Sequence, residues 1–534
     1  MIKDDKTINK EKDLTEYTKE ELIVECLNLR QMTQELNQKM DWLMEQVRLG
    51  NQKRFAPSSE KTEYQQFSLF NEAEVEADLN KQEPTLEQVT YTRRKKQSGK
   101  RDSDLYGLDI ETTEYELTGS DLNCTECGGL LHIMGKVVHK HLKYIPAKLV
   151  VEEQIEYVYS CRNCEKNNIK VPVVRAAAPK PVIKNSIASP SLVANIMNLK
   201  YVNAVPLHRQ EQEFLRNDFV LSKQTMANWM IRCATDWLEP IYETMKKKLL
   251  QHDILFADET SVQVLDEPGR KATTQSYMWL YRTSDKSSTP ICLFEYQPTR
   301  AKENPRNFLK EFKGYIHSDG YEAYHSLPEG ITVVGCFAHA RRYYDEALKV
   351  IKQEERATSN AIVGYKYCNM LFSIEETFSE ISAEERYKKR LELSKPILDA
   401  FLAWALKMQP ITAPKSAFGK AINYTLEQSK YLQHFLLDGR LELSNNLSER
   451  SIRDFVIGRG NWLFSKSQNG AMSSATIYSI IQTLKENGIK PVPYLTHVFE
   501  ELPNIDFREN PKLLENFMPW SEEIQNRFKI TKKA

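Results

Sequence analysis

The sequence has no excess charge of either sign and no long apolar run. Its 534 residues include 73 Lys and Arg and 73 Asp and Glu, so the formal net charge at pH 7 is zero. This balance neither favours nor excludes a nucleic acid partner, because local patches matter more than totals. No stretch reaches the roughly 18 apolar residues of a membrane helix, and the charged start Met1–Lys6 is not followed by the apolar stretch of a signal peptide. We therefore expect a cytosolic protein without membrane contact.

The nine cysteines do not fit a disulfide framework, because their number is odd and five of them are scattered. The other four form two Cys-x-x-Cys pairs, Cys124 with Cys127 and Cys161 with Cys164. Each pair can place two thiolates on one tight turn, and two such turns complete a tetrahedral Zn²⁺ shell. Between the pairs, Leu149–Val151 and Ile155–Tyr159 read as strands. We predict a zinc ribbon with structural Zn²⁺ in residues 116–180; the alternative is two chance pairs.

The first fifty residues contain a leucine repeat. The leucines that recur every seven residues are Leu22, Leu29, Leu36 and Leu43. A heptad pattern of this length predicts a coiled coil over residues 1–50 and self-association through it. A single amphipathic helix packed on its own domain is the alternative.

Residues 51–115 read as a linker that contains a basic run. The four cations at its start are Arg93, Arg94, Lys95 and Lys96, and two more follow before residue 102. Such a run can grip phosphates without sequence preference. A solvated tail explains it equally well.

Residues 185–250 have a helical pattern. Within it, Ser222 is the predicted N-cap of a helix that continues past Trp229. A turn followed by a capped helix is typical of a helix-turn-helix DNA reader. A plain helical connector is the other interpretation.

From residue 254 the pattern changes to short strands. The five predicted strands are 254–257, 277–281, 291–296, 315–318 and 331–335, with a helix at 304–312 between the third and the fourth. Helical periodicity then continues to about 435. This order is that of a ribonuclease H-like fold, in which the first and fourth strands are neighbours. We therefore expect a multidomain α+β protein with a ribonuclease H-like α/β core in residues 251–484 and a helical tail in residues 485–534.

Three carboxylates lie in settings that suit metal-dependent chemistry. Asp258 and Asp319 each end a short apolar run, and Glu449 lies in the helical stretch 444–450. If the first and fourth strands are neighbours, the two aspartates repel each other unless a cation lies between them. Mg²⁺ (or Mn²⁺) suits such a hard oxygen site, and a pair of divalent ions drives phosphoryl transfer on nucleic acid backbones. The rival to Asp258 is Glu259, which points to the opposite face of a strand.

Spacing alone does not single out Glu449, because a surface glutamate paired with Arg453 has the same pattern. On a helix, Asn445, Glu449 and Arg453 share one face; Asn445 could orient a ligand and Arg453 could reach a phosphate. The further candidates for DNA backbone contact are Arg450, Arg459 and Lys466. Cys336 and His339 form a Cys-x-x-His motif that could bind metal or position a base. A buried thiol followed by a helix-start histidine is the favoured interpretation of that motif.

Several of these segments, in this order, resemble the large transposase subunit of the insertion sequence 66 family. The matching segments are Leu69–Glu74, Lys200–Glu211, Ala257–Thr260, Asp319–Tyr321, Cys336–Arg342, Asn445–Arg450 and Gly458–Phe464. His208, Phe337 and Gly460 stand where the family more usually has Tyr, Trp and Lys. The resemblance implies a DDE triad of Asp258, Asp319 and Glu449, with a helical insertion at about 345–440.

The resemblance implies a Mg²⁺-dependent DNA transposase. We expect water to hydrolyse a phosphodiester at the end of an insertion sequence, and the freed 3′-hydroxyl to attack target DNA. The zinc domain and linker would bind terminal inverted repeats, the coiled coil would pair protomers, and small accessory proteins would act beside it. The alternatives are a non-enzymatic, zinc-containing DNA-binding dimer acting as a regulator, and a nuclease without strand transfer.

Overall fold

The computed structural model describes residues 148–160 and 173–530, together with residues 19, 30 and 112. The chain divides into two compact units, one containing Pro179–Ile530 and the other containing Pro57–Ala178. The predicted coiled coil, the basic run and the four cysteines of the predicted zinc site lie outside the described residues.

The described part of the smaller unit is a two-stranded antiparallel ribbon. Strands β1 (Val158–Ser160) and β2 (Val173–Arg175) pair with each other, and the amide of Ala176 extends the ladder to the carbonyl of Tyr157 at 3.0 Å. They flank the second cysteine pair in sequence. The strand predicted at Leu149–Val151 is wrong, and the one predicted at Ile155–Tyr159 is confirmed only from Val158 onward. The β-branched residues of 149–157 are exposed, and no described strand pairs with this segment.

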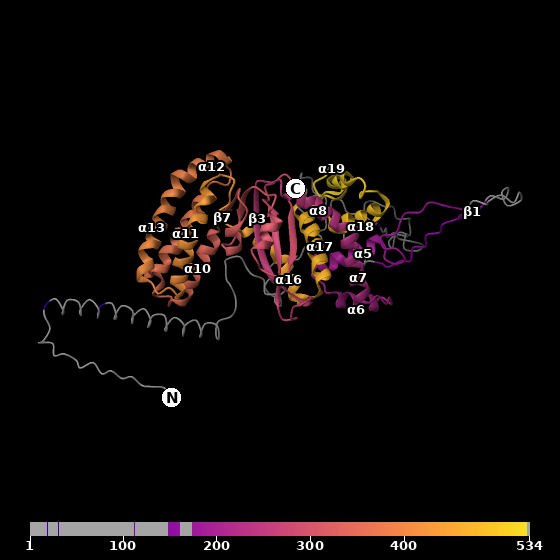
Figure 1. Ribbon diagram of the computed structural model, residues 1–534, viewed down its shortest axis with the longest axis horizontal. Coiled ribbons are helices and arrows are strands. Elements are labelled where there is room, and N and C mark those ends of the chain that lie inside the picture. The colour runs from indigo at the N-terminus through magenta and orange to yellow at the C-terminus, as the bar shows by residue number, and fades with distance from the viewer. Residues whose placement is uncertain (1–18, 20–29, 31–111, 113–147, 161–172, 531–534) are drawn as a thin grey trace, which may run out of the picture. The chain divides into compact units, whose positions relative to one another are not determined.

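A mixed sheet lies at the centre of the larger unit (Figure 1). Its main strands are β3 (Ile254–Asp266), β4 (Gln275–Thr283), β5 (Cys292–Gln297), β6 (Gly314–His317) and β7 (Ile331–Val334), in the order β5-β4-β3-β6-β7. β4 runs antiparallel to β3 and β5, whereas β6 runs parallel to β3 and β7. The five predicted strands are confirmed, and so is the prediction that the first and fourth are neighbours.

β3 is much longer than predicted, with 13 residues. It pairs with β4 on one side. On its other side, Ile254–Phe256 pairs with β6 and Gln263–Asp266 pairs with β8 (Phe464–Ser467). Between these two ladders, residues 257–262 have no partner among the described strands on that side. Asp258 therefore does not end a strand, as predicted, but lies inside one, beside a gap in the sheet.

Helices from both ends of the larger unit pack on one side of the sheet (Figure 1). Before the sheet come α5 (Pro190–Tyr201), α6 (Leu207–Arg216), α7 (Lys223–Cys233), a π-helical turn (Ala234–Leu238) and α8 (Glu239–Leu249). After it come α16 (Asn446–Trp462), α17 (Gln468–Glu486), α18 (Pro491–Glu501), 3₁₀ turns (Leu502–Asn504, Pro511–Phe517) and α19 (Glu522–Phe528). The hydroxyls of Ser479 and Thr483 on α17 accept hydrogen bonds from the amides of Phe294 and Cys292 at 2.7 and 3.0 Å. These bonds cover the outer edge of β5.

The predicted N-cap of α7 is confirmed, because Ser222 Oγ accepts a hydrogen bond from the amide of Thr225 at 3.1 Å. Residues 217–222 connect α6 to α7. This connection is longer than the three to four residues typical of a helix-turn-helix.

A helical segment follows β7 and lies on the other side of the sheet (Figure 1). Its helices are α10 (Phe337–Val350), α11 (Asn360–Glu376), α12 (Ala383–Lys389), a π-helical turn (Arg390–Ser394), α13 (Lys395–Met408), α14 (Ala417–Glu427) and α15 (Ser429–Leu432), with 3₁₀ turns at Arg356–Thr358, Gln409–Ile411 and His434–Leu436. They enclose a separate apolar core, which includes Tyr344, Leu371 and Phe401. The helical periodicity predicted for this part of the chain is confirmed.

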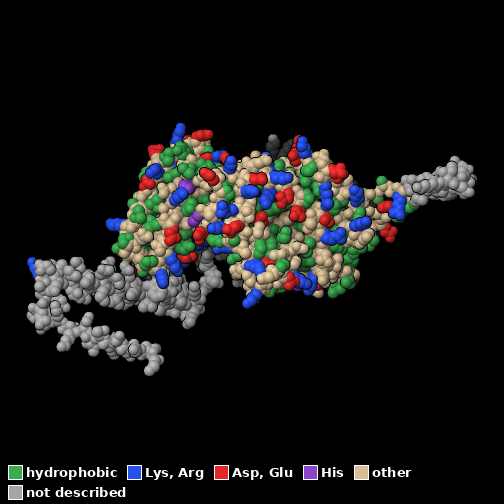
Figure 2. All heavy atoms as spheres, in the orientation of Figure 1, with side chains coloured by type: hydrophobic (Ala, Val, Ile, Leu, Met, Phe, Trp, Pro, Cys, Tyr) green, Lys and Arg blue, Asp and Glu red, His purple; other side chains and the backbone are tan. Residues whose placement is uncertain are grey.

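Two short elements connect the strands. α9 (Glu303–Phe308) is shorter than the predicted helix 304–312, because the chain turns after Leu309 and buries Phe312 before entering β6. A 3₁₀ turn, Glu322–Ser326, follows β6. Among the described residues, no helix is both long and apolar enough to cross a membrane. On the face that Figure 2 shows, Lys and Arg are interspersed with Asp and Glu.

Candidate active site

Asp258 on β3 and Asp319 just after the end of β6 occupy equivalent register positions. In the parallel ladder, Phe256 on β3 lies opposite His317 on β6, and their rings stack with centroids 4.4 Å apart. Asp258 and Asp319 each follow two residues later. The parallel register therefore brings together two carboxylates that are far apart in the sequence, as the sequence predicted.

The backbone around Asp319 is fixed by the helical segment. Tyr424 Oη on α14 donates to the carbonyl of Asp319 at 2.9 Å, and the Gln428 amide donates to the carbonyl of Gly320 at 3.4 Å. Gly320 has a φ of +93°, and a Cβ there would lie 3.0 Å from the Gln428 side chain. A glycine is therefore required directly after Asp319, since other residues strain at this φ and crowd Gln428.

Negative charge at this position is not neutralised by the chain. Burial, and then the charges of Glu259 and Asp319, raise the pKa of Asp258 well above its usual range. Its Oδ1 accepts one hydrogen bond, from the amide of Glu259 at 2.8 Å. Neither Asp258 nor Asp319 forms an ion pair with a described residue. Such a pair attracts a cation.

The adjacent Glu259 is held differently. Its side chain is 1% exposed and pairs with Arg300, whose Nε donates to Oε1 at 2.9 Å, while Tyr324 Oη donates to Oε2 at 2.8 Å. The guanidinium of Arg300 in turn lies 3.6 Å from the centre of the Tyr321 ring. Glu259 is thus satisfied by the chain, whereas Asp258 is not, and this separates the two rivals.

Helix α16 lies across the gap in the sheet. At its start, the side-chain amide of Asn445 donates to the carbonyl of Ala257 at 2.8 Å. In its last turns, Arg459 donates to the hydroxyl of Thr260 at 3.1 Å and to the carbonyl of Ser261. Glu449 lies between these two anchors, in the first turn of the helix. The gap beside Asp258 is therefore spanned by the helix that carries the third carboxylate.

A buried arginine of β4 fixes the same helix from behind. Arg282 is 1% exposed and donates to the Leu447 carbonyl at 3.4 Å, to Ser451 Oγ, and to Glu486 of α17 at 3.0 Å. Together with Asn445 and Arg459 it sets the position of α16 against β3 and β4. None of these roles for Arg282 was predicted, because its partners come from distant parts of the sequence.

Glu449 faces an arginine and a histidine of α10. Arg342 Nη2 lies 3.3 Å from its Oε2, and His339 Nε2 lies 3.7 Å from its Oε1. Burial lowers the pKa of His339, while the nearby charges of Glu449 and Asp319 act in the opposite direction. The helix start at Cys336–Arg342 thus faces an anionic group. The competing prediction, an ion pair between Glu449 and the exposed Arg453, is not found among the described residues.

Cys336 is a buried thiol at the N-cap of α10, and burial raises its pKa to about 11. The amide of Asn445 donates to its sulfur at 3.1 Å. Cys336 therefore connects the start of α10 to the start of α16. This geometry agrees with the interpretation of a buried thiol followed by a helix-start histidine.

The oxygen atoms around the gap fit a hard divalent cation, although among the described residues no three His, Cys, Asp or Glu side chains are already arranged to hold one. Asn445 Oδ1 and Glu449 Oε1 are buried without a hydrogen-bond partner among the described residues. Buried oxygens left in this state need a ligand to offset their desolvation. Carboxylate and amide oxygens are the ligands that Mg²⁺ and Mn²⁺ prefer.

The other cations predicted for DNA contact lie in two environments. Arg453 and Lys466 are exposed, and Arg450 is exposed with its guanidinium 4.0 Å from Asp285. Arg459 is partly buried, and its hydrogen bonds go to β3. Arg450, Arg453 and Lys466 are therefore open to solvent, whereas Arg459 is used by the fold.

Asp258 on β3, Asp319 just after β6 and Glu449 on α16 form a candidate metal-dependent site in a mixed α+β protein. Comparison with known proteins gives the family. Residues 185–473 match the model of the Transposase IS66 family, residues 121–165 match the zinc-finger binding domain of transposase IS66, and residues 42–108 match the Transposase C of IS166 homeodomain. The chain belongs to the IS66 transposase family.

Relatives that are similar over about three quarters of this chain are found in Sinorhizobium fredii. The protein y4jD is 30% identical over 410 residues, which cover 74% of this chain and 78% of the relative. The protein y4qI is 30% identical over 414 residues, which cover 74% of this chain and 73% of the relative. The family assignment confirms the resemblance inferred from the motifs. A zinc-finger domain and a transposase domain are therefore both present.

Proposed function

We propose that this protein is a DDE transposase, which cleaves DNA at the ends of an insertion sequence and joins those ends to target DNA. The observation that carries the proposal is the pair Asp258 on β3 and Asp319 just after β6, neither of which has a cationic partner among the described residues, with Glu449 on the helix that spans the adjoining gap in the sheet. The order of strands and the crossing helix support a ribonuclease H-like core with a helical insertion between Asp319 and Glu449.

Asp258, Asp319 and Glu449 would hold Mg²⁺ (or Mn²⁺). When bound, such ions stabilise charge on the attacking and leaving oxygens of an in-line phosphoryl transfer. The chain would contribute three oxygen ligands, and it leaves Asp258 without a cationic partner among the described residues. Asn445, Arg459 and Arg282 act as positioning residues, because they fix α16, and with it Glu449, against β3.

Two transfers at phosphorus make up the reaction. In the first, a water oxygen bonds to phosphorus, the bond to the 3′-oxygen breaks, and that oxygen takes up a proton to become a free 3′-hydroxyl. In the second, this hydroxyl loses its proton and bonds to a target phosphorus, and a target 3′-oxygen leaves. The exposed Arg450, Arg453 and Lys466 would bind phosphates of the DNA backbone.

The rest of the chain would serve assembly on DNA. Cys124, Cys127, Cys161 and Cys164 would hold structural Zn²⁺, which fits the family's zinc-finger domain. That domain and the basic run Arg93–Lys96 would bind terminal inverted repeats, and the coiled coil in residues 1–50 would pair two protomers in the cytosol. Accessory proteins of the same element are further partners.

The test uses full-length protein, Mg²⁺ and a labelled duplex that carries the element's end. We expect nicking and joining to a plasmid by the unaltered protein, and binding without either reaction by Asp319→Ala. Binding without cleavage by both proteins, even with accessory proteins added, would contradict the proposal and favour a DNA-binding regulator. Nicking without joining would favour a nuclease.

A further inference from the structure

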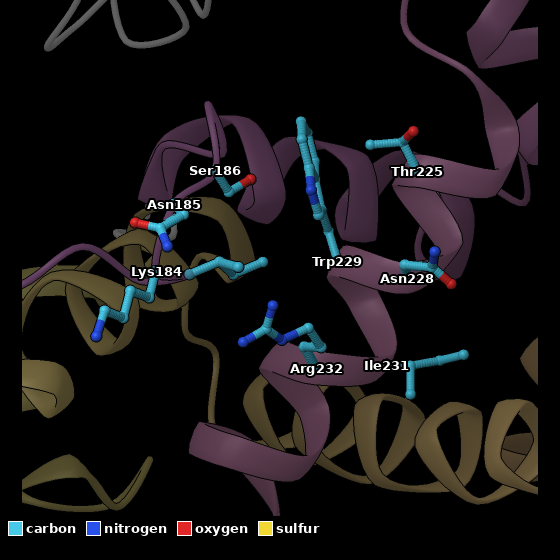
Figure 3. Close-up of a pocket in the computed structure, with 9 residues that line it drawn as sticks. Lys184, Asn185, Ser186, Thr225, Asn228, Trp229, Ile231 and Arg232 are labelled. Atoms are coloured by element: carbon cyan, nitrogen blue, oxygen red, sulfur yellow. The ribbon is translucent and has the colours of Figure 1, made fainter.

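A polar pocket of about 500 Å³ lies between the turn at residues 183–186 and helix α7. The elements that form it carry none of the three carboxylates. Figure 3 shows the turn on one side, α7 on the other, and the ring of Trp229 between them. The polar side chains that line the pocket are those of Lys184, Asn185, Ser186, Thr225, Asn228 and Arg232. We name this feature the α7 pocket.

The α7 pocket is cationic. Lys184 and Arg232 are exposed, they come from opposite walls, and neither forms an ion pair with a described residue. No acidic side chain lines the pocket. Amide and hydroxyl groups between the two cations add hydrogen-bond donors. This combination suits the oxygens of a phosphodiester backbone.

The turn that presents Lys184 is firmly anchored. The preceding Val182 and Ile183 are 2% and 3% exposed, and the indole of Trp237 donates to the carbonyl of Val182 at 3.0 Å. Asn185 has a φ of +57°, in the left-handed region, which asparagine tolerates better than most residues. The cation is therefore displayed from a fixed position.

The opposite wall belongs to a helix with a sharply divided surface. Met226, Met230 and Cys233 are at most 4% exposed and attach α7 to the core. Gln224 and Asn228 are exposed, and Arg232 continues the same line at a spacing of four residues. Asn and Gln are the side chains that pair with the adenine edge in the major groove.

We propose that the α7 pocket is a DNA-binding subsite, at which Lys184 and Arg232 contact backbone phosphates while Asn228 and Gln224 reach base edges in the major groove. The proposal rests on the proposed function, since it assigns part of the transposase's grip on DNA to this surface. It adds a site to the zinc-finger domain and the basic run, and it places that site next to the catalytic core in the chain.

The first experiment measures binding of full-length protein to a labelled duplex with the element's end, by fluorescence anisotropy over a range of salt concentrations. For the double variant Lys184→Gln/Arg232→Gln, we expect weaker binding and a log–log salt slope smaller by about two, since each phosphate contact contributes about 0.9. The control is Lys415→Gln/Lys420→Gln, which removes two exposed lysines of the helical segment. Its slope should equal that of the unaltered protein.

The second variant, Asn228→Ala, tests base contact. We expect it to reduce the preference for the element's end over an unrelated duplex by about fivefold or more, with the salt slope unchanged. An equal loss on both duplexes would overturn base contact by Asn228. Circular dichroism melting of each variant verifies folding.

The proposed function and this inference fail in different ways. If the unaltered protein joins DNA and the double variant keeps both its affinity and its salt slope, the α7 pocket is not a DNA subsite, while the transposase assignment stands. An equal loss of slope in the lysine control also overturns the site. If Asp319→Ala and the unaltered protein behave alike in cleavage, the proposed function fails, whatever the α7 variants do.

Discussion

Two charge clusters of this protein differ in how their charges are compensated. In the helical segment, Arg390 is fully buried and donates to Glu375 and to the carbonyls of Phe435, Asp438 and Leu441 at 2.9, 3.0 and 2.7 Å. Its charge is neutralised and its donors are used by the chain itself. Beside β3, at the gap in the sheet, Asp258 and Asp319 have no cationic partner among the described residues. The first cluster stabilises the fold, whereas the carboxylates of the second remain available to a ligand.

The same contrast separates adjacent residues of β3. Glu259 has Arg300 and Tyr324 as partners, and Asp258, one residue earlier, has a single backbone amide. A buried carboxylate without a partner costs stability. The proposed metal binding would explain why it is retained, because a bound ion would offset the repulsion.

The largest expected effect is on catalysis. Asp319→Ala, and likewise Asp258→Asn, should lower the rate of Mg²⁺-dependent strand transfer by on the order of 10⁴-fold, the scale seen when a member of a catalytic constellation is removed. Affinity for the end duplex should stay unchanged. Asp266→Asn is the matched control, since Asp266 is exposed near the end of the same strand. Equal rates for Asp266→Asn and Asp319→Ala would break the contrast.

The structural cluster should respond in stability. Arg390→Met removes the nearer of two cations from Glu375 and leaves Arg386, whose Nε lies 3.9 Å from the carboxylate. The free energy of unfolding should therefore fall by about 3 kcal/mol, the lower end of the range for broken buried pairs. Urea denaturation monitored by tryptophan fluorescence measures this. Lys389→Met changes the exposed neighbour in sequence and should have little effect. A small change for both variants would show that Arg390 is not a stabilising centre.

A smaller effect, on metal affinity, is expected at Glu449, which is a proposed metal ligand and also forms an ion pair with Arg342. Arg342 competes with a cation for this carboxylate, and its side chain is 45% exposed. Arg342→Gln should therefore tighten Mn²⁺ binding, by less than about tenfold because exposed ion pairs contribute about 0 to 1 kcal/mol. Calorimetric titration without DNA measures the affinity, with Arg450→Gln as the control. Weaker Mn²⁺ binding by Arg342→Gln would mean that Arg342 supports the ligand set.

The smallest effect concerns stability without added divalent metal. Because the folded-state pKa of Asp258 is raised, the folded protein retains a proton there at pH values where the unfolded chain has released it. The stabilisation linked to this proton is fully present below the pKa of Asp258 in the unfolded chain. It is lost as the pH rises through the pKa of Asp258 in the folded protein. Asp258→Asn should therefore unfold at a higher temperature than the unaltered protein at pH 7.5, with the difference shrinking toward pH 4. Thermal melts at both pH values test this, and a less stable variant at pH 7.5 would contradict it.

Much of the core was predictable because its strands are marked by short apolar runs. All five predicted strands are found, and the parallel pairing of the first with the fourth follows from their order. The length of β3 was not predictable, since Glu259–Asp266 mixes polar and apolar residues and is a strand only through pairing with β4 and β8. The strand at Leu149–Val151 was predicted wrongly for the converse reason, as its residues have strand propensity but no described partner.

The site was predicted in part. The three carboxylates and His339 were identified from the sequence, but the residues that position and contact them were largely not. Asn445 was expected on one helix face with Glu449, and it lies instead just before the helix, buried and bonded to Ala257. Arg282 and Arg300 were missed altogether, and Arg342 was noted only within its motif, without its contact to Glu449. Only the short interval between Cys336 and Arg342, within one motif, could have drawn attention to Arg342.

The sequence by itself determined the local elements, the family, and the identity of the residues that can bind metal, because apolar periodicity and motifs are written in neighbouring residues. The tertiary structure decided which of those residues are free. In the folded chain Asp258 lies beside a gap in the sheet, and Glu259 forms an ion pair with Arg300. Glu449 faces Arg342 and His339. Whether a charge is neutralised depends on partners that are distant in sequence, so only the folded chain can separate a structural carboxylate from one available to a ligand.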